Sequence, residues 1–203
     1  MKIYILDING ITCEKNDMEF KGSKKHHEAG QFLLRHALGE DAYEKAEFAK
    51  GEHGKPYIKG LPNHYNISHS GQYVVLVTAN SEVGVDVQEK KTARIQAMVN
   101  RFFSEEEKRA VLACTGTEEG GRILQSGEED AEEDSKKVQS DLFFHIWCRK
   151  EAYGKYLGLG LLGDVLKTNV LETIEGCFFR EYSRLEGYQI SICYGKEEEI
   201  EEV

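Results

Sequence analysis

The sequence lacks any long hydrophobic run, which excludes a membrane-spanning helix. Its apolar runs, such as residues 73–79, are far shorter than the roughly 20 residues that a transmembrane helix needs. It also lacks an early segment that joins a basic start, an apolar run and a small-residue cleavage site. We therefore expect a cytoplasmic protein with no membrane partner. Its 203 residues, 40% of them hydrophobic, are enough for one large or two small domains with a packed core.

Cysteine is scarce, and its spacing argues against a disulfide scaffold and against a zinc site. The number is odd, and no two cysteines stand at CxxC spacing. The five residues are Cys13, Cys114, Cys148, Cys177 and Cys193. We expect them to be reduced, as buried apolar residues or bystanders.

The chain has no excess of positive charge, and its acidic charge is concentrated in two segments. The formal net charge is −10. Residues 116–141 contribute −6 and residues 196–203 contribute −4, so the rest of the chain is neutral. Nucleic-acid binding needs a basic face, so we expect no nucleic-acid partner. A neutral body does not exclude a small anionic ligand.

Residue periodicity predicts an α+β protein, because strands, helices and strands follow one another along the chain. Strands are predicted at residues 1–8, 65–68, 73–78, 84–88, 177–185 and 188–194. Helices are predicted at residues 23–38, 92–112 and 141–157, with caps at Ser23 and Asp141 and a break at Ser104, which begins a capping box. The acidic residues 115–140 are predicted to form a long mobile insert.

The helix predicted at residues 141–157 carries the first candidate site. Trp147, Glu151 and Lys155 are spaced by four residues and therefore share one face. An acid, a base and an indole on one face are unusual if that face meets only solvent. The alternative is a surface Glu–Lys pair worth about a few tenths of a kcal/mol.

Asp86 is the second candidate, because it lies between two valines of a predicted strand. A carboxylate there is costly unless it caps a turn, pairs with a cation or binds a metal. Gln88 shares its face of the strand, and Glu89 points to the other face. One carboxylate from the strand and one from the helix, Glu151, could hold a Mg²⁺ ion that keeps water and phosphate oxygens.

Two further segments carry groups that bind anions. Residues 66–71 (NISHSG) end a strand with hydroxyls, an imidazole and turn amides, which can hold phosphate oxygens. The densest basic cluster begins the helix at residues 23–38, where the helix dipole also favours anions. The cluster consists of Lys21, Lys24, Lys25, His26 and His27. The alternatives are a structural histidine at position 69 and a solvated basic helix end.

Five motifs in order, GKP, NISHSG, GVDV, RFFSEEE and WCRKEAYGKYLGLGL, resemble the signature blocks of the 4′-phosphopantetheinyl transferases. More narrowly, they resemble the larger, surfactin-synthetase-activating class. The blocks run from residue 54 to residue 161, about half of the chain. The resemblance implies a monomer built as a pseudo-dimer of two similar α/β halves. Residues 1–90 would bind coenzyme A, and residues 91–203 would carry the catalytic helix and the insert at residues 115–140.

The resemblance also implies roles for individual residues. Asp86 and Glu151 would hold Mg²⁺, or Mn²⁺ in its place, and Gln88 stands where the family often has a further acid. Glu151, or a water that it holds, would be the general base, and Lys155 would contact the pyrophosphate and assist the leaving group. The implied contacts of coenzyme A are Lys21, Lys24, Lys25, Lys55, Pro56, Ser68, His69, Asp86, Lys150 and Lys155.

The implied reaction transfers 4′-phosphopantetheine from coenzyme A to a serine of an apo acyl-, polyketide- or peptidyl-carrier protein. It releases 3′,5′-adenosine diphosphate. The sequence departs from the family at Gln88 and at Gln31, which we align with a helix arginine near the 3′-phosphate. These departures leave a second hypothesis, a module that binds coenzyme A or a carrier without transfer. A third is an α/β domain with no ligand. The acidic insert is expected to repel acidic carriers unless it swings away.

Overall fold

The computed structural model describes residues 1–10, 20, 22–61, 64–91, 95–114 and 129–203, and it contains three sheets. The first has the order β4-β5-β1-β9, formed by β4 (His64–Ser70), β5 (Tyr73–Ala79), β1 (Lys2–Asp7) and β9 (Glu201–Glu202). The second has the order β6-β8-β7, formed by β6 (Val83–Glu89), β8 (Tyr188–Tyr194) and β7 (Phe178–Tyr182). A small hairpin of β2 (Phe48–Lys50) and β3 (Pro56–Ile58) makes the third.

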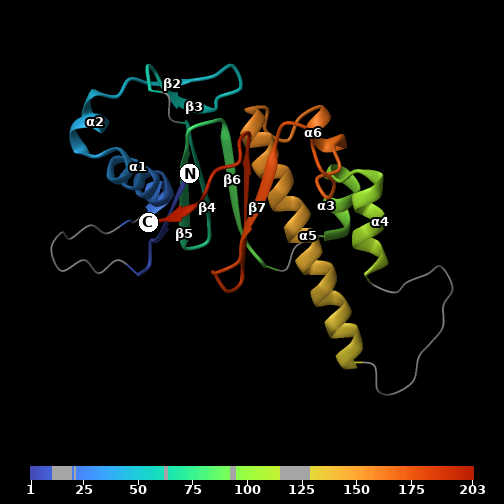
Figure 1. Ribbon diagram of the computed structural model, residues 1–203. Coiled ribbons are helices and arrows are strands. Elements are labelled where there is room, and N and C mark those ends of the chain that lie inside the picture. Colours follow the sequence, from blue (N-terminus) through green and yellow to red (C-terminus); the bar gives the residue numbers. More distant parts are fainter. Residues whose placement is uncertain (11–19, 21, 62–63, 92–94, 115–128) are drawn as a thin grey trace.

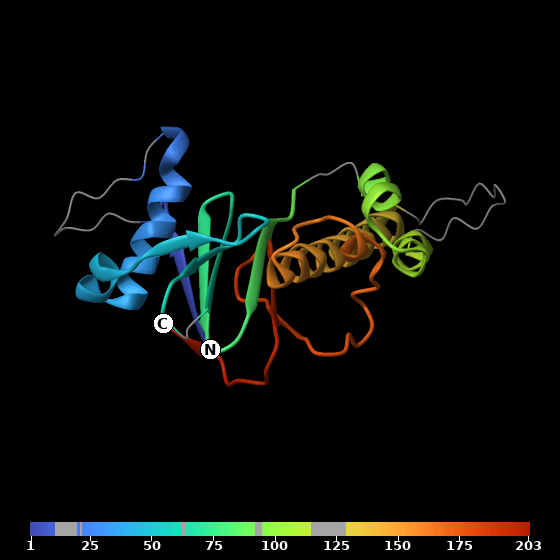
Figure 2. The ribbon, with the colours of Figure 1, turned by 90° about the horizontal axis from the view of Figure 1, so that it is seen from above.

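The two larger sheets share one core, and each has a helix on its other side (Figures 1 and 2). β5 is buried on both faces, as its continuous apolar run predicted. Val75 and Val77 pack toward β6 and β8, whereas Val74 and Leu76 pack against α1 (Lys25–Leu38). The long helix α5 (Glu129–Leu157) lies across β6 and β8. The mixed α+β class is therefore confirmed.

Side chains, not a backbone ladder, join the two larger sheets where β4 lies beside β6. The side-chain oxygens of Asn66, Ser68 and Ser70 point toward β6 at every second residue of β4. They accept the backbone N–H groups of Val85, Val87 and Glu89 at 2.9, 3.2 and 3.0 Å. The alternation follows from the two-residue period of a strand. The NISHSG motif thus forms the seam between the sheets.

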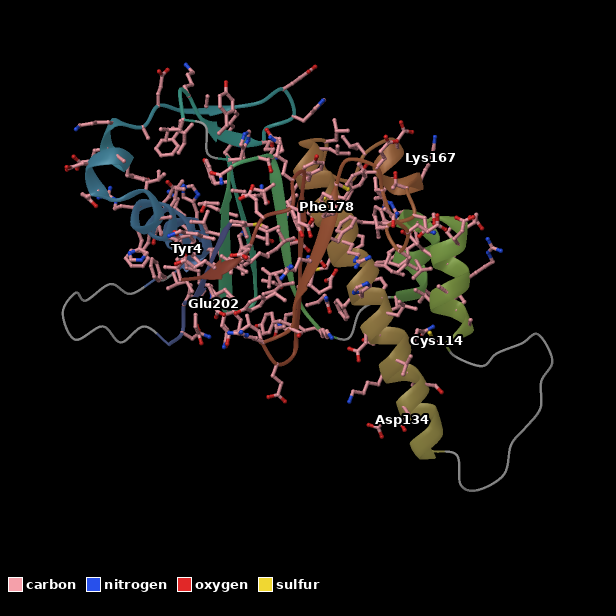
Figure 3. All side chains as sticks on the ribbon, in the orientation of Figure 1. Tyr4, Cys114, Asp134, Lys167, Phe178 and Glu202 are labelled. Carbon is pink, nitrogen blue, oxygen red and sulfur yellow. The ribbon has the colours of Figure 1, made fainter. Side chains whose placement is uncertain are left out.

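The acidic segment before the helix predicted at residues 141–157 differs from our expectation. We predicted a loop over residues 115–140, but α5 already begins at Glu129; residues 115–128 lie outside the described part. Glu, Lys and Ala are good helix formers, so a segment with few apolar residues can extend a helix that packing has already nucleated. Figure 3 shows Asp134 on this extension, beyond the sheets. The predicted cap Asp141 is instead an interior residue of α5, and it pairs with Lys90 at 2.7 Å.

The shorter helices also test the sequence predictions. The break at Ser104 is confirmed, because Ser104 caps α4 (Glu105–Ala113) in a full capping box and α3 (Ile95–Phe102) ends just before it. The predicted cap at Ser23 is wrong. A short 3-10 helix, η1 (Gly22–Lys24), precedes α1, and no side chain caps α1. The other short helices are α2 (Glu40–Lys45) and α6 (Asp164–Lys167). None of the helices in the described residues is long and apolar enough to cross a membrane.

Candidate active site

The candidate site lies where α5 crosses β6, and Gly84 makes that crossing close. A Cβ atom at Gly84 would lie 2.1 Å from the carbonyl oxygen of Ala152 and 2.4 Å from the backbone nitrogen of Tyr156. Both are backbone atoms of α5, so no side-chain movement could make room. The missing side chain therefore lets the helix backbone rest on the strand, which brings Lys155 and Glu151 next to Asp86.

Asp86 is 2% exposed, and both of its carboxylate oxygens accept hydrogen bonds. Oδ1 accepts from Lys155 Nζ at 2.6 Å and from Ser68 Oγ at 2.9 Å. Oδ2 accepts from Gln88 Nε2 at 3.0 Å and from Cys148 Sγ at 3.4 Å. Gln88 and Asp86 therefore share a face of β6, as the strand register predicted. The structure unites Asp86 with Lys155, which lies 69 residues further along the chain.

Glu151 is half-buried beside this pair, one helical turn before Lys155. Burial raises the pKa of Glu151, the charge of Asp86 raises it further, and Lys155 opposes the shift. Among the residues that the structure describes, Glu151 has no hydrogen-bond or ion-pair partner. Two carboxylates, Asp86 and Glu151, therefore lie close together, and a cation bound between them would be favourable.

Ser68 holds Asp86 and does not reach outward as a contact for coenzyme A. Its hydroxyl donates to Asp86, and it accepts from the backbone N–H of Val87 and from Lys155 at 3.0 Å. A hydroxyl has one donor and two acceptor positions, so all three are used. Ser68 is also 5% exposed. The structure thus gives it a positioning role in place of the predicted ligand contact.

His69, the next residue, points the other way and borders a cavity of about 740 Å³. Its ring stacks on that of His26, with 4.5 Å between the centroids and 2° between the planes. Burial lowers the pKa of His69, and His26 and Lys155 lower it further. His26 also contacts the carbonyl oxygen of Gly71 at 2.9 Å through Nε2. The residue of α1 beside His69 is therefore His26, which our sequence prediction noted only as part of a basic cluster.

Gln31, which we aligned with a helix arginine near the 3′-phosphate, borders the cavity of His69. Its Oε1 accepts a hydrogen bond from the hydroxyl of Tyr43 at 2.6 Å. Lys24 and Lys25 lie at the start of α1, where the dipole favours anions. Lys21 lies outside the described residues.

Lys55, in the loop between β2 and β3, contacts the end of α5. Its Nζ lies 2.5 Å from Oε2 of Glu82 and 2.9 Å from the carbonyl oxygen of Tyr156. Pro56, beside it, borders the cavity of His69 and also a second cavity of about 550 Å³. Both residues therefore lie near the predicted coenzyme A region, but Lys55 already has an anionic partner.

Lys150 is not part of this group, in contrast to our prediction. Its side chain is fully buried and pairs with Glu107 at 2.9 Å. It also donates to the carbonyl oxygen of Thr168 at 2.8 Å. Glu107 in turn accepts the backbone N–H of Val170 at 2.8 Å and closes the capping box of α4. Lys150 and Glu107 thus join α4, α5 and the segment after α6.

Trp147 shares the helix face of Glu151 but belongs to the core. Its ring contacts Phe102 with 5.3 Å between the centroids and stacks on Phe143 at 6.4 Å. Of the three residues spaced by four, the structure therefore brings two, Glu151 and Lys155, to Asp86. The indole instead fixes the helix against α3.

Comparisons with known proteins agree with the motif order. The family model described as the 4′-phosphopantetheinyl transferase superfamily matches residues 82–195. A 4′-phosphopantetheinyl transferase of Bacillus subtilis is 30% identical over 159 residues, which cover 72% of this chain and 62% of that relative. The transferase Sfp of Bacillus subtilis strain 168 is 28% identical over the same shares. The transferase AcpT of Escherichia coli K12 is 28% identical over 168 residues, 81% of this chain and 72% of that relative.

The chain therefore spans less than two thirds of the length of the Bacillus subtilis relative, 62%. The family match begins just before β6 and ends just after β8, so it contains Asp86, Glu151 and Lys155. It covers more than half of the sequence, and the Bacillus relatives agree with the surfactin-synthetase-activating class. This chain belongs to the 4′-phosphopantetheinyl transferase superfamily.

Proposed function

We propose that the protein transfers 4′-phosphopantetheine from coenzyme A to a serine hydroxyl of an apo acyl-, polyketide- or peptidyl-carrier protein. The released product would be 3′,5′-adenosine diphosphate. The observation that carries the proposal is the meeting of Asp86, Glu151 and Lys155 at the crossing of β6 and α5, inside the region that matches the family.

The donor set of the site fits a divalent metal ion. Among the described residues no three His, Cys, Asp or Glu side chains form a metal-binding group. Mg²⁺, however, needs only one or two protein carboxylates together with phosphate oxygens and water. Asp86 and Glu151 would hold it, and Mn²⁺ could replace it. Gln88 would reach the ion only after its amide turns, because its nitrogen now faces Asp86. The bound ion would neutralise charge on the pyrophosphate.

The protein's own groups have complementary tasks in this reaction. Glu151 is the proposed base for the carrier serine, since burial raises its pKa and makes it a better proton acceptor. Lys155 would donate to the leaving phosphate as the P–O bond breaks. His69, with His26 stacked on it, and the lysines at the start of α1 would meet the nucleotide phosphates.

We further propose that the chain is built as two similar halves with coenzyme A bound between them. In support, each large sheet has one long helix on its outer side. The pairing of β6 with β8 supports a boundary near residue 82 in place of residue 90. The segment at residues 115–140 would then be an insert of the second half, with its last part folded into α5.

A mass measurement tests the function. The protein, coenzyme A and Mg²⁺ are mixed with apo acyl-, polyketide- and peptidyl-carrier proteins in separate reactions. Each served carrier should gain the mass of one phosphopantetheine, and EDTA should prevent the gain. Glu151→Gln and Asp86→Ala should fold normally and nearly abolish transfer. Binding of coenzyme A with no mass change on any carrier would instead indicate a non-catalytic binding module.

A further inference from the structure

Lys155 and Asp86 form the closest contact of the site, and it occupies an oxygen that a metal ion would need. Lys155 Nζ lies 2.6 Å from Oδ1 of Asp86. Ser68, Gln88 and Cys148 supply the other donors to this carboxylate. Four donors saturate the two oxygens. A cation can therefore bind Asp86 only after a donor has moved, and Lys155 is the one with a positive charge and a long, flexible stem.

The charge balance of the site depends on this lysine. Asp86 is 2% exposed, and Glu151 is half-buried with no partner among the described residues. A buried carboxylate without a cation is costly. Among the described residues, Lys155 supplies the one positive charge in direct contact with Asp86, so it compensates the charge of this carboxylate.

The side chain of Lys155 also has room to move away from Asp86. Its side chain is 27% exposed, whereas that of Asp86 is 3% exposed, so the lysine lies on the open side of the pair. Its Nζ also lies 3.0 Å from Ser68 Oγ, and His69, the next residue of β4, borders the cavity described above. The ammonium group can therefore turn outward to an anion while Ser68 keeps its bond to Asp86.

We propose that Lys155 is an exchangeable resident cation of the Asp86–Glu151 site. Lys155 gives up Asp86 when a divalent cation binds there, and the pyrophosphate of coenzyme A is the anion that receives it. Lys155 therefore opposes metal binding in the free protein and opposes it less when coenzyme A is present. The part that concerns coenzyme A rests on the proposed function; the exchange itself does not.

The first test measures Mn²⁺ binding to the free protein by the electron paramagnetic resonance of unbound Mn²⁺. Lys155→Met keeps most of the length of the side chain and removes its charge. It should bind Mn²⁺ at least about tenfold more tightly than the wild type, because a unit charge in contact with the ligand carboxylate has gone. Lys90→Met is the matched control, since it removes a lysine that pairs with Asp141 of α5, a carboxylate outside the site. Its affinity should stay within about twofold, as expected for a screened charge. Equal affinities in Lys155→Met and the wild type would overturn the proposal.

The second test uses the wild-type protein, so it does not depend on the folding of a variant. Brief acetylation with acetic anhydride, read by peptide mass spectrometry, reports the accessibility of each lysine amine. Mg²⁺ without coenzyme A should raise the labelling of Lys155 several-fold and leave Lys90 unchanged. Unchanged labelling of Lys155 at saturating Mg²⁺ would also overturn the proposal. Neither test contains a carrier or measures transfer, so a negative result here leaves the proposed function standing, and failure of transfer leaves the exchange standing.

Discussion

Replacing Gly84 with alanine should displace α5 without removing any of the groups that we propose for catalysis. The new Cβ atom would lie 2.1 Å from Ala152 O and 2.4 Å from Tyr156 N. Favourable contacts with carbon need about 3.5 Å, so the backbone of α5 must move away from β6 by about 1 Å. Overpacking of this kind costs about 1–3 kcal/mol in the free energy of unfolding. For a chain of this size that is a fall in Tm of about 2–12 °C.

The same displacement should slow the reaction, because Lys155 and Glu151 move with the helix while Asp86 stays on the strand. A misplacement of about 1 Å can cost about 100-fold in rate. The assay is the mass-detected transfer to a carrier, with kcat/KM compared at saturating Mg²⁺ alongside Tm. Gly10→Ala is the control, since among the described residues the atoms nearest to its Cβ atom would belong to the side chain of Asp7, at 3.4 Å. A Gly84→Ala protein with wild-type Tm and kcat/KM would refute the close crossing as the device that assembles the site.

Three further changes test other parts of the structure. Lys150→Met should lower the free energy of unfolding in urea by about 3–5 kcal/mol, because it leaves Glu107 charged, buried and unpaired; replacing both residues with methionine should restore much of that loss. Gln88→Glu should lower the Mg²⁺ concentration at half-maximal transfer with little change in maximal rate, since a carboxylate binds Mg²⁺ better than an amide; an unchanged midpoint would place this side chain away from the ion. His69 has a lowered pKa in the folded state, so the stability it contributes is present above pH about 6.5 and is lost as the pH falls through the folded pKa. Urea melts at pH 7.5 and pH 5 should therefore differ less in His69→Gln than in the wild type.

Alternation along single strands could be predicted from the sequence, because it depends only on local backbone geometry. Asp86 and Gln88 were expected on one face of β6, and the hydrogen bond between them confirms it. The buried run of β5 and the capping box at Ser104 were predicted for the same reason. The motif order also identified the family, since five blocks in one order are specific.

The sequence alone could not show which residues of one motif belong to the site and which belong to the core. Lys150 and Lys155 lie on the same helix five residues apart, and both were expected at the phosphates. Because the helix twists between them, the two side chains point in different directions. Lys150 forms a buried ion pair with Glu107, whereas Lys155 contacts Asp86. That difference depends on where α4 and β6 pack against α5, and no local sequence pattern predicts it.

The sequence by itself determined the six longer strands, the C-terminal ends of α1 and α5 and the family of this protein, because these depend on local propensity and on ordered motifs. The short strands β2, β3 and β9 and the short helices α2 and α6 were not predicted. Only the tertiary structure decided which groups share a site. Ser68 and His69 are neighbours, yet one holds Asp86 at the seam and the other stacks on His26 beside a cavity. Their partners come from β6 and α1, distant in the chain. Contacts of this kind follow from the packing of sheets and helices as whole bodies, which residue order alone does not express.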